Sequence, residues 1–112
     1  MSKPDRVLSM MSIAAKGRNL VSGEFAVEKA VKTGTAHLVI VAEDASDNTK
    51  KQFRNMCEFY EVPMVVYGNK DVLGHFIGTQ MRANVAITDA GIAKSILKSV
   101  ILFKVSSVSN NA

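Results

Sequence analysis

The sequence has a single cysteine, Cys57, and no long run of apolar residues. One cysteine excludes an internal disulfide and a cysteine-based zinc site, fits a reducing compartment, and is expected in the core. No segment approaches the roughly 20 consecutive apolar residues that a membrane-spanning helix requires. The first residues, MSKPDRVLSMMS, place acidic and polar side chains where a signal peptide has its apolar stretch, so we expect a cytoplasmic protein.

The sequence also lacks the arrangements that catalysis and cofactor binding usually need. Gly17, Gly23 and Gly34 do not form the glycine-rich phosphate loop of nucleotide enzymes. No serine or cysteine is placed by the sequence to act with His37 or His75, which we expect to be structural or surface residues. The sequence therefore predicts a non-catalytic protein without a cofactor.

Two adjacent carboxylates, Glu43 and Asp44, follow the most apolar segment of the chain. Carboxylates can bind a cation, but side chains alternate in direction along a strand, which would separate these two. We expect them to serve as turn or cap residues, and we predict no metal site.

The charge balance is basic, with 14 Lys and Arg against 10 Asp and Glu and a net charge of +4. This balance favours polyanionic partners, although the charges are scattered, so folding must assemble any basic patch. The 112 residues, 47% of them hydrophobic, suffice for one compact domain with one core.

Apolar residues recur at helical spacing in some segments and form short continuous runs in others. The run HLVIVA at 37–42 is typical of a central strand buried on both faces. The pattern predicts helices over 5–16, 23–33, 47–61, 69–77 and 90–102 and strands near 20–21, 37–42, 64–67 and 85–88. Ser22 is expected to cap the second helix and Ser46 the third.

Strands that alternate with helices predict an α/β sandwich. From Val105 onward the residues VSSVSNNA show no periodicity and are mostly small and polar. We therefore predict one domain over residues 1–104 and a flexible C-terminal tail over residues 105–112.

The second helix is the first candidate for a binding surface. Its start at Gly23 and Glu24 offers free backbone N–H groups to an anion. Helical spacing places Phe25, Lys29 and Lys32 together on the side opposite the apolar face. Phe25 could stack on a base between two lysines that neutralise phosphate, or it could fold back against the first helix, and the sequence leaves both readings open.

Two further connections carry residues suited to RNA contact. The first is YGNKDVLG at 67–74, and the second is GTQMRANV at 78–85. In the second, Met81 can make an apolar contact and Arg82 can bind a phosphate or a guanine. A solvated loop with one arginine is the alternative.

Three longer motifs identify a family. The segments KAVKTGTAHLVIVAEDAS, MCEFYEVPMVVYGNKDVLGHFIG and RANVAITDAG resemble the kink-turn RNA-binding ribosomal protein superfamily, which includes L7Ae and L30e. LVSGE followed by AEDASDNTKK resembles its small bacterial YlxQ branch. The resemblance covers residues 8–95 and implies an α/β/α sandwich around a four-stranded mixed sheet.

The resemblance also implies a set of RNA-binding residues. Gly23 and Lys29 match the family's recognition helix, whereas Phe25 and Ala26 stand where RNA-binding members have the asparagine and glutamate that read sheared G·A pairs. Further matches surround the pocket for an extruded nucleotide: Lys70, Arg82, and, with different residue types, Ser46 and Lys50.

We therefore predict a protein that binds kink-turn or similarly bent RNA, ribosomal or messenger, as a monomer and without a membrane partner. Gly23 and its neighbours would bind phosphate, Lys29 would enter the groove, and Lys70, Met81, Arg82 and Ala83 would surround the extruded nucleotide. The ribosome is a candidate partner. The alternative is a protein-interaction module that keeps the fold and uses Phe25 and Ala26 as an apolar contact surface.

Overall fold

The computed structural model describes the backbone of residues 5–110 and the side chains of residues 5–102. The helices are α1 (Arg6–Lys16), α2 (Glu24–Lys32), α3 (Asp47–Phe59), α4 (Lys70–Phe76) and α5 (Ala90–Asn110). The strands are β1 (Leu20–Ser22), β2 (Leu38–Val41), β3 (Met64–Val66) and β4 (Asn84–Ile87). Each predicted helix and strand is therefore present.

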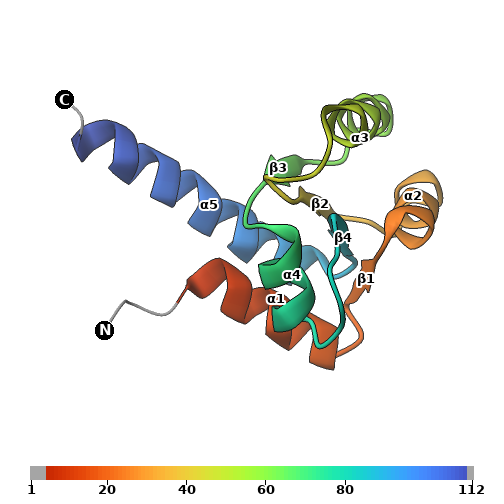
Figure 1. Cartoon of the computed structure of the whole chain (residues 1–112), viewed down its shortest axis with the longest axis horizontal. Coiled ribbons are helices and arrows are strands. Elements are labelled where there is room, and N and C mark those ends of the chain that lie inside the picture. The colour runs from red at the N-terminus through yellow and green to blue at the C-terminus, as the bar shows by residue number, and fades with distance from the viewer. Residues whose placement is uncertain (1–4, 111–112) are drawn as a thin grey trace.

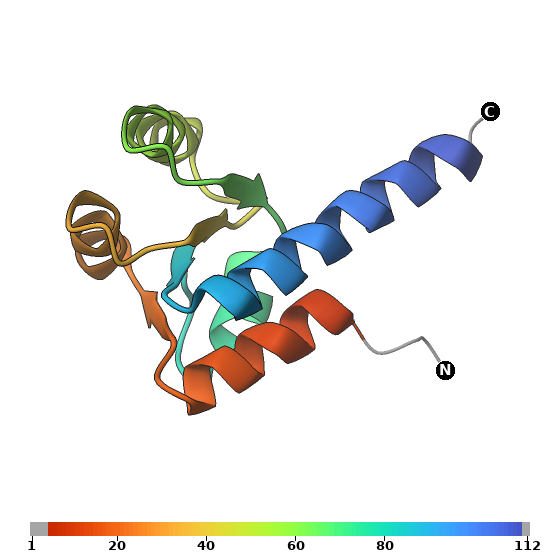
Figure 2. The ribbon, with the colours of Figure 1, turned by 180° about the vertical axis from the view of Figure 1, so that it is seen from behind.

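The strands form one mixed sheet between two layers of helices. Its order is β1-β4-β2-β3, in which β2 and β3 are parallel and the other neighbouring pairs are antiparallel. Helices α2 and α3 cover one face of the sheet, while α1, α4 and α5 lie on the other face (Figures 1 and 2). This arrangement confirms the predicted α/β/α sandwich with a four-stranded mixed sheet.

The core lies on both faces of the two central strands. Every residue of β2 and β4 is buried, as the apolar run HLVIVA predicts for β2. Helix α1 buries one face through Val7, Leu8, Met11 and Ala14, which recur at intervals of three and four. Phe53 and Cys57 do the same for α3, so the predicted core position of the cysteine is confirmed.

Two predicted boundaries are wrong. Ser22 does not cap α2, because it is the last residue of β1, and Gly23 occupies the cap position with φ 94° and no side-chain hydrogen bond. Helix α5 does not end near Leu102 but continues to Asn110, so residues 105–110 of the predicted tail are helical. Residues 111–112 lie outside the described part of the chain.

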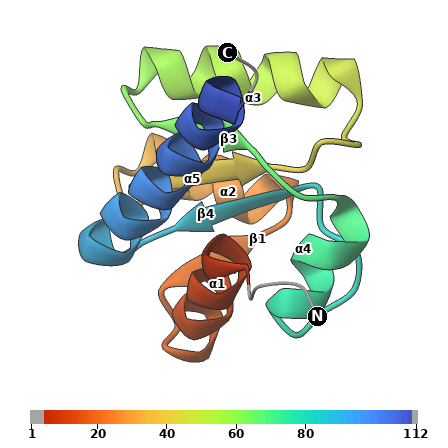
Figure 3. The ribbon, with the colours of Figure 1, turned by 90° about the vertical axis from the view of Figure 1, so that its left-hand side faces the viewer.

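One end of the sheet gathers segments that are distant in the sequence. The Gly23 N–H donates to the Asn84 carbonyl at 3.1 Å, and the Ala42 N–H donates to the Ala83 carbonyl at 2.8 Å. These bonds bring together the start of α2, the exit of β2 and the loop that precedes β4. Helix α4 and its following loop stand at the same end of β4 (Figure 3).

Candidate nucleic-acid interface

The start of α2 presents unpaired backbone donors. The first intrahelical bond runs from the Val27 N–H to the Gly23 carbonyl at 3.0 Å, which leaves the N–H groups of Glu24, Phe25 and Ala26 without an acceptor inside the helix. Gly23 adopts φ 94°, a conformation that a residue with a side chain rarely takes, and a Cβ there would meet nothing within 4 Å. Backbone conformation, rather than lack of space, therefore explains this glycine.

The loop between α4 and β4 places Arg82 beside this helix start. Arg82 Nε donates to Ser22 Oγ at 3.0 Å, and its Nη1 donates to the Met81 carbonyl at 3.0 Å. The Arg82 N–H donates to the Lys70 carbonyl at 3.1 Å, which ties the loop to the start of α4. A Cβ on Gly74 would collide with the backbone of Gln80, so this glycine permits the close approach of the loop.

The turn after β2 is closed by its own hydrogen bonds. Asp44 Oδ1 accepts from the Lys70 N–H at 2.9 Å, which fits the turn or cap role expected for this carboxylate. Lys50 Nζ donates to the Glu43 carbonyl at 2.6 Å. Ser46 Oγ accepts from the N–H three residues later at 3.1 Å, so it caps α3 as predicted. Ser46 and Lys50 thus have structural partners in this turn.

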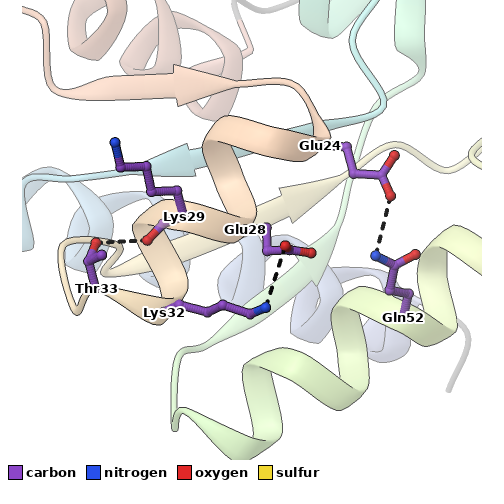
Figure 4. Close-up of polar contacts among 6 residues, drawn as sticks. All are labelled: Glu24, Glu28, Lys29, Lys32, Thr33 and Gln52. Atoms are coloured by element: carbon purple, nitrogen blue, oxygen red, sulfur yellow. Dashed lines mark hydrogen bonds and ion pairs between the residues drawn. The ribbon is translucent and has the colours of Figure 1, made fainter.

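The exposed side of α2 carries the aromatic and basic residues. Phe25 is 81% exposed, which excludes the reading in which it folds back against the first helix. Lys32 Nζ lies 3.4 Å from Glu28 Oε2, whereas Lys29 extends without a partner among the described residues (Figure 4). Glu24 Oε1 accepts from Gln52 Nε2 of α3 at 3.2 Å (Figure 4).

These segments line a surface cavity of about 330 Å³ that is open to solvent. Its walls come from the end of β1, the start of α2, helix α3, and the loop that leads into β4: Ser22, Gly23, Glu24, Thr49, Met81, Arg82, Ala83 and Asn84. Five of the residues predicted from the sequence line it, namely Gly23, Glu24, Met81, Arg82 and Ala83. Phe25, Lys29 and Lys32 lie outside it on α2, and Ser46, Lys50 and Lys70 lie outside it on other elements.

Three cavity residues were missed by the sequence analysis: Ser22 as an anchor for Arg82, Thr49, and Asn84. The Ser22 contact joins residues 60 positions apart, which local spacing does not show. Asn84 could have been noticed, because it is the only polar residue in the strand NVAI.

The groups that catalysis or metal binding would use are not gathered in the described residues. His37 and His75 are both exposed. Burial raises the pKa of the Cys57 thiol to about 11, which keeps it protonated and unreactive at neutral pH. Within residues 5–110, no group of three or more His, Cys, Asp or Glu could hold a metal ion, and no helix has the length and apolar character to cross a membrane.

Comparison with known proteins finds a matching protein family and similar sequences. The sequence profile of the ribosomal protein L7Ae/L30e/S12e/Gadd45 family matches residues 5–97. The RNA-binding protein YlxQ of Bacillus subtilis is 39% identical over 88 residues, which span 79% of this chain and 88% of that protein. These matches confirm the family resemblance.

Solved structures share the fold. A protein of unknown function from Bacillus halodurans C superposes with a TM-score of 0.84 at 36% identity, over 87% of this chain and 98% of that one. The 15.5kD RNA binding protein of Giardia lamblia superposes with a TM-score of 0.74 at 24% identity, over 89% and 92% of the two chains. The second likeness supports the fold alone.

Proposed function

The chain belongs to the ribosomal protein L7Ae/L30e/S12e/Gadd45 family, and on that premise we propose that it is a non-catalytic protein that binds structured RNA. The observation that carries this proposal is the uncapped start of α2, with free N–H groups beside an anchored Arg82, an unpaired Lys29 and an exposed Phe25. The RNA-binding protein YlxQ of Bacillus subtilis, 39% identical, supports the same reading.

Each part of this surface has a distinct task in RNA binding. The N–H groups at the start of α2 bind a phosphate, because a helix N-terminus carries partial positive charge. Lys29 neutralises a second phosphate or enters the groove, and the exposed faces of Phe25 and Met81 contact bases. Lys70, Arg82 and Ala83 border the nucleotide that a bend extrudes. Lys32, Ser46 and Lys50 lie at the edge of the surface and already have protein partners.

We propose bent RNA, a kink-turn or a similar fold, as the target, and ribosomal or messenger RNA in the cytoplasm as its source. Phe25 and Ala26 supply no side-chain hydrogen bonds to base edges, so stacking of the Phe25 ring takes the place of groove readout at position 25. We further propose that a monomer is the binding species, with the ribosome as a candidate site of action.

One observation favours a second candidate. The 81% exposure of Phe25, together with 53% for Met81, also suits an apolar contact with another protein. In that case, the fold would be kept while the surface serves a protein partner. The two candidates differ in their response to RNA shape.

The test is a titration of a kink-turn RNA and a plain duplex of equal length, each at two salt concentrations. Charge alone binds both RNAs alike and weakens equally with salt, whereas the proposed site discriminates between them. Equal affinity for the two RNAs, or no binding to either, would contradict the proposal and favour the protein-interaction module.

Two variants test the residues of the site. Lys29→Ala and Arg82→Ala should each weaken binding to the bent RNA by about 1–3 kcal/mol where they contact base edges, and by a smaller, salt-sensitive amount where they contact phosphate. Lys98→Ala is the matched control, because Lys98 is an exposed lysine of α5 on the other face of the sheet. Unchanged affinity in both site variants would show that RNA binds elsewhere.

A further inference from the structure

Helices α1 and α5 lie side by side on the face of the sheet opposite α2 and α3 (Figure 2). The Thr88 N–H donates to the Asn19 carbonyl at 2.9 Å, so the end of α1 lies beside the start of α5 and the two helices run in opposite directions. Neither helix carries a residue of the proposed RNA-binding surface. Between them is a surface cavity of about 260 Å³, here called the α1–α5 groove, which is lined by Met10, Ile13, Asp89, Gly91, Ile92 and Ser95.

The floor of the α1–α5 groove is aliphatic and open to solvent. Ile13 is 63% exposed, and Met10 and Ile92 are half-buried. Aliphatic side chains that are gathered in one exposed hollow are unfavourable in water and are typical of a contact with another molecule. RNA bases stack on aromatic rings, and none of the lining residues is aromatic. A protein therefore suits this floor better than RNA does.

Helix α5 extends the apolar surface beyond the groove. It has 21 residues and α1 has 11, so α5 runs about ten residues, or about 15 Å, past the start of α1 (Figure 2). Leu102, which is 56% exposed, follows Ser95 by seven residues and therefore lies on the same side of α5 as the groove. A partner helix laid along α5 would cover both the groove and Leu102.

Basic residues stand beside the groove on both helices. Arg6 precedes Met10 by four residues and Lys98 follows Ser95 by three, so each lies one turn beyond the cavity on the groove side of its helix. Lys94 lies next to Ser95, and all three basic side chains are exposed. The ion pair found among residues 5–102 lies within α2, so these three cations have no carboxylate partner in that part of the chain.

The carboxylates at the starts of the two helices already have partners within the protein. Asp89 Oδ2 accepts the Ile92 N–H at 2.8 Å. Asp5 accepts the Leu8 N–H at 3.0 Å and the Tyr67 hydroxyl at 2.6 Å. The groove therefore combines an aliphatic floor with unpaired positive charge, and electrostatic complementarity favours a partner that is apolar in its centre and acidic at its edges.

We propose that the α1–α5 groove docks an amphipathic α-helix of a partner protein, with Asp or Glu on the flanks of its apolar stripe. The stripe covers the aliphatic floor and continues to Leu102, while the flanking carboxylates pair with Arg6, Lys94 and Lys98. Because α1 and α5 carry none of the proposed RNA-binding residues, the protein can hold RNA and this partner at the same time. The inference does not depend on the proposed RNA-binding function, and failure of RNA binding would leave it intact.

The test uses a synthetic amphipathic helix of about 18 residues, or five turns, as the probe. It carries leucines at intervals of three and four and glutamates on both flanks, and its binding is measured by fluorescence anisotropy. It should bind at least about tenfold more tightly than a peptide of scrambled order and a peptide with lysines in place of the glutamates. No binding, or equal binding of the three peptides, would overturn the proposal.

Two variants locate the bound peptide. Ile13→Ser removes an exposed apolar side chain from the floor and should weaken binding by about tenfold, whereas Phe59→Ser, at a 78% exposed position of α3, should not. Lys98→Glu should weaken the glutamate peptide by about fivefold and strengthen the lysine peptide by a similar factor. Lys51→Glu, at an exposed lysine of α3, is its matched control. Equal effects of the variants and their controls would mean that the peptide does not occupy the groove.

Two measurements on the wild type need no substitution. The methyl signals of Met10, Ile13 and Ile92 in a ¹³C-correlation spectrum should shift when the glutamate peptide is added, and peptide binding that leaves them unmoved would overturn the proposal. The peptide should also stay bound when a plain RNA duplex or vesicles of anionic lipid are added. Displacement by either would show that the groove is a general surface for polyanions, and the assignment to a protein helix would be wrong.

Discussion

Helix α2 begins differently from the other helices. Asp5, Ser46 and Asn69 cap α1, α3 and α4 by accepting a backbone N–H at 3.0, 3.1 and 2.8 Å. Asp89 accepts one at 2.8 Å at the start of α5. The cap position of α2 is held by Gly23, which has no side chain that could accept a backbone N–H.

We infer from this difference that the capped helix starts serve stability, whereas the uncapped start of α2 serves binding. A side-chain cap stabilises a helix start by about 0.5–2 kcal/mol and satisfies donors that would otherwise need water. At the start of α2 that stabilisation is absent, and Gly23 and Glu24 line the cavity of about 330 Å³ beside Arg82. Changes at the capped starts should therefore reduce stability, and changes around Gly23 should reduce binding.

The largest expected effect follows from the α1 cap. Asp5 Oδ1 accepts the Leu8 N–H at 3.0 Å, and its Oδ2 accepts the Tyr67 hydroxyl at 2.6 Å. Asp5→Ala removes both bonds, so we expect it to lower the free energy of unfolding by about 2–4 kcal/mol in urea denaturation. RNA affinity of the folded variant should change by less than about twofold.

Tyr67→Phe is the matched control, because it removes the hydroxyl and keeps the cap. Burial and the Asp5 carboxylate raise the pKa of the Tyr67 hydroxyl, so it remains a donor throughout the neutral range. The variant should lose less stability than Asp5→Ala. If Asp5→Ala weakened RNA binding as strongly as Lys29→Ala, the separation of the two roles would be wrong.

Periodicity predicted the fold because burial dictates it. The HLVIVA run and the apolar faces of α1 and α3 are buried as expected, since each side chain removed from water contributes about 1.5–3 kcal/mol. The Ser46 cap was predicted because its signal is local. The same signal failed at Ser22, because the adjacent Gly23 adopts φ 94° and starts the helix one residue later.

Some features were missed because they depend on contacts between segments that are distant in the sequence, and one because the sequence carries no local signal for it. The Arg82–Ser22 bond and the burial of the Asn84 side-chain oxygen without a hydrogen-bond partner among the described residues arise only when distant segments meet at one end of the sheet. Helix α5 exceeded its predicted length because no glycine or proline follows Gly91 to stop it. The family resemblance and the helical and loop spacing predicted the site residues that line the cavity. Such patterns indicate which helix or loop carries a residue, but not which distant residues it contacts.

The next effect concerns the exposed aromatic on α2. Phe25→Ala should weaken RNA binding by about 1–3 kcal/mol if the ring stacks on a base. Phe59→Ala is the matched control, because Phe59 is 78% exposed at the end of α3, away from the cavity. Affinity is measured by titration of the bent RNA, and unfolding in urea confirms that each variant is folded.

A double change distinguishes stacking from groove readout. Replacing Phe25 by Asn and Ala26 by Glu restores the side chains that read sheared G·A pairs in RNA-binding relatives, so kink-turn affinity should rise if groove readout is possible here. A fall in both this variant and Phe25→Ala would establish the ring as the contact. No effect on RNA, combined with loss of a protein partner in a pull-down, would favour the interaction module.

The smallest expected effect tests whether Arg82 acts from a fixed position. Ser22→Ala removes the acceptor of Arg82 Nε, which lies 3.0 Å away, but keeps the positive charge. RNA affinity should fall by about 0.5–1.5 kcal/mol, less than for Arg82→Ala, because only orientation is lost. The salt dependence should stay that of the wild type, whereas Arg82→Ala should reduce the salt slope by about 1 if Arg82 contacts a phosphate.

The two changes together give the sharper result. If Ser22 acts through Arg82, then Ser22→Ala should have no further effect in an Arg82→Ala protein. Ser95→Ala, an exposed serine of α5, should leave affinity unchanged in either background. Additive losses from Ser22→Ala and Arg82→Ala would mean that Ser22 contacts the RNA itself. The Ser22 hydroxyl, at the end of β1, would then bind RNA together with the uncapped start of α2.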